Sequence, residues 1–412
     1  MKKKLLISSL AFCTIANAQT AYITCEGANK VYVCNVATNM LTDSIAVGHN
    51  PYGVSVSSDG TKVYVTTQAD NTVTVINTAN NTVSAIIGGV GKFPGGISVS
   101  PDGTKVYVAN QHDSTVYVIK TATNTVSDSI PVGSFPIGVT VTPDGTKVYV
   151  TNRNDNTVSQ INTATNTVAA TIAVGKSPNG ISVSPSGAAV YVANGGDSTV
   201  SVINTGTNTV SATIAVGSNP HCLSVSPNGS KVYVTTPPNT VTVIDTITNT
   251  VSATISVGTG PVGVSVSPDG TKVYVASNGS NTVSAINAIT NTVSATIAVG
   301  FLAEGFGNFI STYPAVTGLV TPNMWNAGIR VYPNPSTGKF NLVISNEMKQ
   351  SYAVEIYNVL GEKIFSEWMP SAQSAFFNKQ PIIDISSQLN GMYLVQFKSE
   401  NEISTQKIII QK

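Results

Sequence analysis

The sequence predicts an all-β protein of two modules, and three observations lead to that prediction. A unit of about 42 residues recurs through residues 19–310. Within each unit apolar and polar residues alternate with period two, and β-branched Thr and Val dominate the alternating runs. The repeat ends near residue 310, and charged residues then become more frequent toward the C-terminus. No helical periodicity appears in the repeats.

Tyrosine marks the repeat. Seven tyrosines recur at spacings of 42, 43, 42, 42, 42 and 41 residues: Tyr22, Tyr64, Tyr107, Tyr149, Tyr191, Tyr233 and Tyr274. A glycine near the start of each unit recurs with about the same spacing, and Cys222 replaces it once. These glycines are Gly53, Gly96, Gly138, Gly180, Gly263 and Gly305. A period of this size is typical of repeat architectures.

Each unit predicts four short strands. In the best-formed unit they cover residues 139–141, 147–151, 158–161 and 167–174. The first two are joined by Pro143-Asp144-Gly145, in which Pro presets φ, Asp caps the turn and Gly permits a positive φ.

The ends of the repeat region distinguish a β-solenoid from a β-propeller. Residues 22–24 match the second strand of a unit, and residues 305–310 match a first strand. The C-terminal end therefore supplies the strand that the first unit lacks, which closes a ring and pairs the edge strands. The predicted fold is a seven-bladed β-propeller with four-stranded blades and a one-plus-three ring closure.

The C-terminal region predicts a separate module. Residues 311–326 indicate a linker, and residues 327–412 contain short strand-like runs whose number and length favour a small β-sandwich.

The N-terminus has the features of a signal peptide over residues 1–18. Lys2 to Lys4 precede an apolar stretch at residues 5–15, and Ala16-Asn17-Ala18 predicts cleavage before Gln19. A membrane anchor is the first alternative, but about 20 apolar residues are needed to span a bilayer. A lipoprotein signal at Cys13 is the second, and the bulky Phe12 before it argues against that motif.

Composition narrows the function classes. The formal net charge is +1 and charged residues make up 10% of the chain, so a nucleic-acid partner is not expected, because it requires a basic surface. No other stretch predicts a transmembrane segment in the mature chain. Cys25, Cys34 and Cys222 remain after cleavage, and we expect free thiols, with Cys34 in the core.

The repeat carries a family resemblance. Residues Tyr149-Val150-Thr151-Asn152, with the flanking Pro-x-Gly and Pro-Asp-Gly, resemble the signature of the YVTN-repeat β-propeller family. The resemblance covers residues 19–310 and implies the propeller fold. It says little about function, because that family includes surface-layer-like proteins and binding proteins.

The C-terminal module resembles the type A sorting domain of the type IX secretion system. The resemblance rests on motifs in the order that family shows, and the residues we carry over as the sorting signal are Tyr332, Pro333, Asn334, Pro335, Gly338, Gly361, Asp384, Gly391, Tyr393 and Lys407. It implies the type IX machinery as a partner, export across the outer membrane, removal of the module, and a cell-surface or extracellular location.

A ligand site should appear as a departure from the repeat, since positions common to all units explain the fold. Residues just before the marker glycine should rim the channel at the face that carries the links between blades. The candidate ligand-binding residues at this mouth are Tyr52, Asn179, His221, Glu304, Phe93 and Phe135. We expect a concave mouth of aromatic and polar groups there.

The sequence predicts no catalytic residue, metal site or cofactor. The histidines lack ligand spacing. His221-Cys222 are adjacent on a strand and should point to opposite faces, which argues against a nucleophilic dyad. Asp59, Asp102, Asp144 and Asp269 occupy equivalent hairpin turns, where Asp is a turn former.

Three functions stay open. The favoured one is a secreted or surface propeller that binds an unknown ligand or protein. The alternatives are a propeller enzyme acting on extracellular polysaccharide and a structural surface-coat protein.

Overall fold

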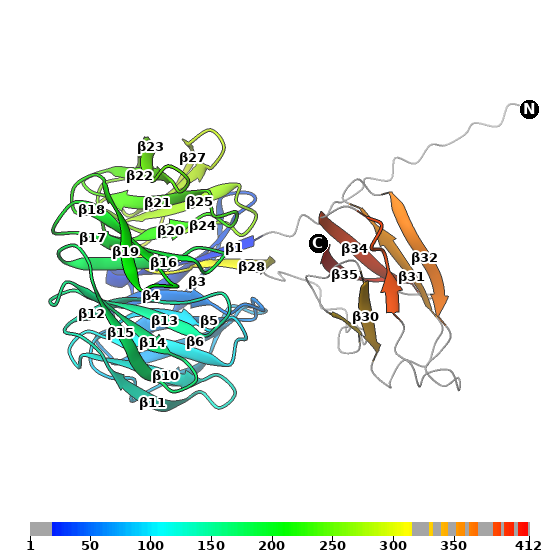
Figure 1. Cartoon of the computed structure of the whole chain (residues 1–412), viewed down its shortest axis with the longest axis horizontal. Helices are drawn as coiled ribbons and strands as arrows, with labels where there is room; N and C mark the ends of the chain where they lie inside the picture. The colour runs from blue at the N-terminus through cyan, green and yellow to red at the C-terminus, as the bar shows by residue number, and fades with distance from the viewer. Residues whose placement is uncertain are drawn as a thin grey trace, which may run out of the picture. The chain divides into compact units, whose positions relative to one another are not determined.

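The computed structural model describes residues 19–314, 329–332, 339–344, 352–358, 362–369, 382–388, 391–398 and 403–410. The chain divides into two compact units, residues 1–317 and 318–412, and each is described by itself (Figure 1). The predicted signal peptide and residues 315–326 of the predicted linker lie outside the described residues.

The first unit is a seven-bladed β-propeller whose blades are four-stranded antiparallel sheets. Six blades use strands that are consecutive in the chain. Blade 1 contains β4 (Pro51–Val56), β5 (Lys62–Thr67), β6 (Thr72–Asn77) and β7 (Thr82–Ile87); blade 2 contains β8 (Pro94–Val99), β9 (Lys105–Asn110), β10 (Thr115–Lys120) and β11 (Thr125–Pro131); blade 3 contains β12 (Pro136–Val141), β13 (Lys147–Asn152), β14 (Thr157–Asn162) and β15 (Thr167–Ala173).

The next three blades follow the same pattern. Blade 4 contains β16 (Pro178–Val183), β17 (Ala189–Asn194), β18 (Thr199–Asn204) and β19 (Thr209–Ala215); blade 5 contains β20 (Leu223–Val225), β21 (Lys231–Thr236), β22 (Thr240–Asp245) and β23 (Thr250–Ser256); blade 6 contains β24 (Pro261–Val266), β25 (Lys272–Ser277), β26 (Thr282–Asn287) and β27 (Thr292–Ala298).

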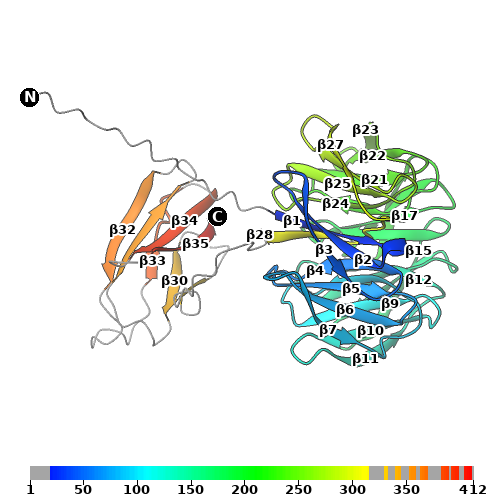
Figure 2. The same ribbon diagram turned by 180° about the vertical axis from the view of Figure 1, so that it is seen from behind.

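Blade 7 closes the ring with both ends of the repeat region. Its strand order is β28 (Ile310–Pro314), β1 (Gln19–Cys25), β2 (Lys30–Asn35) and β3 (Met40–Ala46). A short 3-10 helix, η1 (Glu26–Ala28), follows β1. β28 lies beside β1 in both views (Figures 1 and 2), and their register pairs Gln19 with Pro314. The predicted one-plus-three closure is confirmed.

The closing strand differs in detail from the prediction. We expected a first strand at residues 305–310 and a linker from residue 311, but regular pairing with β1 begins at Ile310 and continues to Pro314. Gly305 and Gly307 explain the shift, because their φ angles of 56° and 119° break the extended backbone before Ile310.

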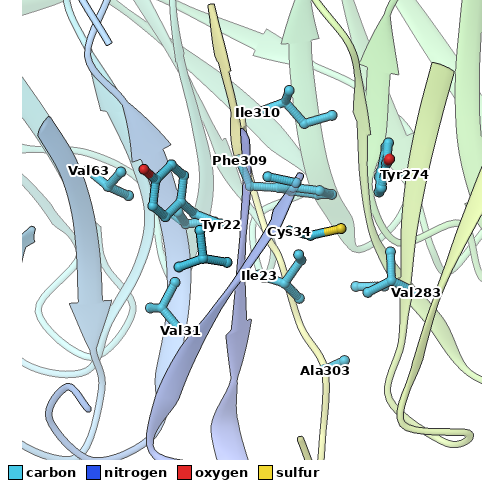
Figure 3. Close-up of a cluster of buried hydrophobic side chains, with 14 of the residues drawn as sticks. Tyr22, Ile23, Val31, Cys34, Val63, Tyr274, Val283, Ala303, Phe309 and Ile310 are labelled. Atoms are coloured by element: carbon cyan, nitrogen blue, oxygen red, sulfur yellow. The ribbon is translucent and has the colours of Figure 1, made fainter. Parts of the chain in front are cut away.

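The core lies between neighbouring blades. Each marker tyrosine is at most 4% exposed and packs with valines and isoleucines of its own blade and an adjacent blade. Figure 3 shows the cluster at the closure, where Phe309 and Ile310 lie with Tyr22, Ile23 and Cys34. Cys25, Cys34 and Cys222 are buried free thiols.

The second unit contains two antiparallel sheets, as predicted for a small β-sandwich. Their strand orders are β29 (Ile329–Tyr332), β30 (Lys339–Ile344), β33 (Ile382–Asp384) and β32 (Lys363–Met369), β31 (Tyr352–Tyr357), β34 (Gly391–Lys398), β35 (Ile403–Ile410). Val354, Ile356 and Val395 are buried. The Glu355 carboxylate pairs with Lys363 and Lys398. No helix in the described part of the chain is long and apolar enough to cross a membrane.

Replacing Phe309 with Ala should destabilise the propeller by about 3–5 kcal/mol, because this fully buried ring fills the core where the two chain ends meet. Denaturant unfolding of the full-length protein measures the change. Phe301→Ala is the matched control, since Phe301 is 60% exposed and should cost no more than about 0.5 kcal/mol. Equal losses in both variants would contradict the ring-closure role of Phe309.

Candidate functional site

The face of interest carries the links between blades and the loops between the second and third strands of each blade; we call it the top face. Aspartates in these loops fix the links. Asp113 Oδ2 accepts a hydrogen bond from Lys92 N at 2.6 Å, and Asp197 Oδ2 accepts one from Lys176 N at 2.6 Å. Asp70 does the same for His49 N at 2.7 Å and also pairs with His49 Nδ1 at 2.9 Å. The link side chains are therefore presented from a fixed backbone.

The channel mouth at the top face is filled by an aromatic side chain. Phe306 is 3% exposed and stacks on Tyr52 with ring centroids 5.0 Å apart. The His221 ring meets the Phe306 ring edge-on, with centroids 5.8 Å apart. We expected a concave mouth here, but residues from blades 1, 5 and 7 meet across it. The positive φ angles of Gly305 and Gly307 bend the backbone on either side of Phe306.

Asn179 and Glu304 were predicted at the same rim, and both are buried at blade junctions. Asn179 is 1% exposed, and its Nδ2 donates to Pro220 O at 3.4 Å. Glu304 is 5% exposed, and its Oε1 accepts a hydrogen bond from Asn278 Nδ2 at 3.2 Å. Both side chains are thus engaged with the neighbouring blade.

Burial dominates the electrostatics at the mouth. It raises the pKa of Glu304 to about 7, with a further contribution from the nearby Glu26. Burial lowers the pKa of His221 to about 4, and the Arg153 charge acts in the same direction. Burial also raises the pKa of Tyr52 well above its usual value, against the opposing effect of Arg153. At neutral pH His221 is therefore uncharged, and Arg153 contributes a positive charge to the electrostatics of the mouth.

A second aromatic group lies farther out on blades 2 and 3. Phe93 and His112 stack with centroids 4.7 Å apart and an interplanar angle of 12°. The His112 ring is also tilted against the Phe135 ring, with centroids 5.9 Å apart. His112 is exposed and the two phenylalanines are half-buried. We call Phe93, His112 and Phe135 the aromatic row.

The backbone of the aromatic row is strained. Phe93 and Phe135 each have φ of 55°, in the left-handed region that bulky residues rarely adopt. They precede the proline that opens the blade, and the equivalent residues of the other blades, all with positive φ, are Asn50, Ser177, Asn219, Gly260 and Leu302. Asn and Gly tolerate this conformation, whereas a phenylalanine costs on the order of 1–3 kcal/mol there.

Below Phe306 the channel contains a small polar cavity of about 80 Å³. Its lining includes the same hydroxyl position from the first strands of blades 1 to 5, Ser55, Ser98, Thr140, Ser182 and Ser224, together with Asn308. Positions common to the blades are expected to serve the fold, so this polar lining was not predicted.

The arrangement offers little for catalysis. Burial raises the pKa of the Cys222 thiol, and its side chain is 3% exposed. Hydrogen bonds from Ser100 Oγ and Thr104 N lower the pKa of the hairpin carboxylate Asp102, as expected of a turn former. Within the described residues no group of three His, Cys, Asp or Glu side chains could hold a metal ion.

The predicted sorting residues fall on both sheets of the second unit. Tyr332, Gly391 and Lys407 lie in β29, β34 and β35. Tyr393 is 6% exposed, and the Asp384 carboxylate pairs with Lys339 at 3.0 Å. Pro333, Asn334, Pro335, Gly338 and Gly361 lie outside the described residues.

Comparisons with protein families agree with this architecture. A model of the YNCE-like β-propeller matches residues 97–186 and 182–300, and one of the lactonase seven-bladed β-propeller matches residues 10–127. The model of the secretion system C-terminal sorting domain matches residues 330–411. The chain is a β-propeller with a type IX secretion sorting domain. This secreted propeller is exported across the outer membrane to the cell surface or the extracellular space.

Solved structures support the propeller fold alone. Hydrazine synthase of Kuenenia stuttgartiensis has a TM-score of 0.57 at 21% identity, over 61% of this chain and 87% of that chain. A functionally unknown protein from Desulfotomaculum acetoxidans DSM 771 has a TM-score of 0.64 at 20% identity, over 72% of this chain and 100% of the other. The search of curated proteins found no match.

Two members of these clusters, Phe306 and His112, were not predicted from the sequence. Phe306 departs from the repeat, because other blades carry Val, Ile or Leu after the marker residue, and this signal could have identified it. His112 is not among the predicted site residues, and its stacking between two blades has no signal in the sequence.

Glu304 gives a pH-dependent prediction. Its folded pKa of about 7 lies above the ordinary value of 4.5, so the folded state holds the proton more tightly. Protonation of Glu304 therefore stabilises the folded state fully below about pH 4.5. This stabilisation, on the order of 3 kcal/mol, is lost as the pH rises through 7. Glu304→Gln should therefore lose less stability than the wild type between pH 5 and pH 8 in thermal melts. The exposed Asp43→Asn is the control, and identical pH profiles for wild type and Glu304→Gln would contradict the prediction.

Proposed function

We propose that this secreted propeller is a binding module whose ligand contacts the aromatic row on the top face. The observation that carries the proposal is the stacked and partly exposed set Phe93, His112 and Phe135, in which both phenylalanines have strained backbone. Strain of this kind persists where the surrounding structure enforces it, and it concentrates at ligand sites. Asn or Gly at the same position would remove the strain, as in blades 1, 5 and 6.

The mouth residues have supporting roles in this proposal. Tyr52 and His221 pack against Phe306 and form the inner boundary of the site. Asn179 and Glu304 are buried and hold the junctions of blades 4 and 5 and of blades 6 and 7. The ligand therefore lies over blades 2 and 3, outside the channel axis.

Binding is favoured over catalysis because the carboxyl and thiol groups of the mouth are buried. Glu304 and Cys222 are at most 5% exposed, and the neutral His221 faces Val262 O at 3.4 Å. The matching lactonase model and hydrazine synthase are enzymes by name, but propeller folds carry unrelated functions.

Export, in this proposal, uses both ends of the chain. Residues 1–18 act as a signal peptide that is cleaved before Gln19. The type IX machinery then recognises the sorting residues Tyr332 to Pro335, Gly338, Gly361, Asp384, Gly391, Tyr393 and Lys407, and the module is removed.

The double variant Phe93→Asn/Phe135→Asn tests the binding site. In a thermal-shift screen of the full-length protein against sugars, polysaccharide fragments, cell-wall pieces and divalent metals, a ligand should raise the wild-type melting temperature by mass action. The double variant should lose that shift while its ligand-free melting temperature changes by no more than about 5 °C. Ser177→Asn, at the same position in blade 4, is the matched control. A ligand that shifts the double variant as strongly as the wild type would refute the site.

The ends of the exported protein test the export route. Mass spectrometry of protein collected outside the cell should find Gln19 at the N-terminus and no peptides beyond roughly residue 330. An extracellular form that retains residues 1–18 or 339–412 would refute the corresponding half of the proposal. A variant lacking residues 327–412 should accumulate in the periplasm.

A further inference from the structure

Three exposed cations of the top face lie on blades 2 to 4, which include the two blades that carry the aromatic row. Lys92 belongs to the link of blade 2, Arg153 to the top loop of blade 3, and Lys176 to the link of blade 4; all three are exposed. The corresponding links and loops of blades 5 and 6 contain no Asp, Glu, Lys or Arg. This asymmetry departs from the repeat at the same place as the aromatic row.

The nearby carboxylates do not neutralise these cations by direct pairing. Asp113, Asp155 and Asp197 accept backbone N–H groups of the links at 2.6, 2.7 and 2.6 Å. Among the described residues, the ion pairs do not include Lys92, Arg153 or Lys176. The ammonium and guanidinium groups remain available to an anion from solution.

Arg153 connects the cations with the aromatic row. Its backbone N donates to Phe135 O at 3.1 Å, which fixes the residue beside the row. Its charge contributes to the pKa shifts of both Tyr52 and His221. A guanidinium presents paired N–H donors that match the two oxygens of a carboxylate.

We propose that the ligand of the aromatic row is a polysaccharide that bears carboxylate groups, such as a polyuronate. This inference rests on the proposed binding function and names its ligand class. Sugar C–H groups carry partial positive charge and pack on the negative faces of aromatic rings. The sugar rings lie along Phe93, His112 and Phe135, and their carboxylates reach Arg153 and the flanking lysines. The site extends over the links of two blades and includes cations from three blades. A polysaccharide chain therefore fits it better than a single sugar does.

Isothermal titration calorimetry, which measures the affinity of the full-length protein for an oligogalacturonate, tests the ligand class. The fully methyl-esterified oligomer has the same sugar rings without the charge, and it should bind at least tenfold more weakly. Arg153→Gln should weaken binding of the acid form at least tenfold and leave the ester unaffected. Lys120→Gln removes a charge at the opposite end of β10 and should change neither affinity. Affinity for the acid should fall as salt rises.

The outcomes separate this inference from the proposed function. Equal affinity for acid and ester, or equal losses in Arg153→Gln and Lys120→Gln, would overturn the carboxylate recognition. If neither oligomer binds but another sugar or a protein binds in a way that Phe93→Asn/Phe135→Asn abolishes, the ligand class is wrong and the site stands. Oligogalacturonate binding that survives Phe93→Asn/Phe135→Asn would overturn both.

Discussion

A threonine hydroxyl relay between neighbouring blades holds the ring together, and the top face depends on it. Thr24 Oγ1 accepts a hydrogen bond from Gly305 N at 2.9 Å and donates to Tyr52 O at 2.8 Å, so one side chain joins the two ends of the repeat region to blade 1. Thr66 and Thr151 make the same two bonds in blades 1 and 3, and Thr235 makes them in blade 5. These groups are buried, and a missing partner would leave an unsatisfied polar atom that costs about 1–3 kcal/mol.

The relay gives a physical meaning to variation within the repeat. Blades 2, 4 and 6 carry Ala109, Ala193 and Ala276 where the other blades carry threonine. In blade 4 the backbone bonds directly instead, since Gly180 N donates to His221 O at 2.8 Å. Threonine and alanine therefore alternate from blade 1 to blade 6, and blade 7 places a second threonine beside that of blade 1.

Hydrogen bonds between neighbouring blades fix the backbone at the channel rim, so the links can vary in sequence without loss of the fold. In blades 1 to 4 a loop aspartate holds the link backbone. The residue before each opening proline adopts the left-handed conformation whether it is Asn, Gly, Ser or Phe. The strain at Phe93 and Phe135 is small beside the many interactions of the ring, and their rings are oriented toward His112. The repeated positions supply the scaffold, and the departures supply the candidate site.

The sequence by itself determined the blades, their number, the closure by both chain ends and the sorting module, because each follows from local alternation, a fixed period and short motifs. It also selected Phe93, Phe135, Tyr52 and His221 as departures on one face. Only the tertiary structure decided which of them meet. Phe306 enters the channel mouth because two glycines adopt positive φ, and His112 reaches Phe93 because a loop and a link from distant segments pair through their backbones. The burial of Glu304 and Asn179 depends on how adjacent blades approach, and the period of a repeat contains no information about that junction.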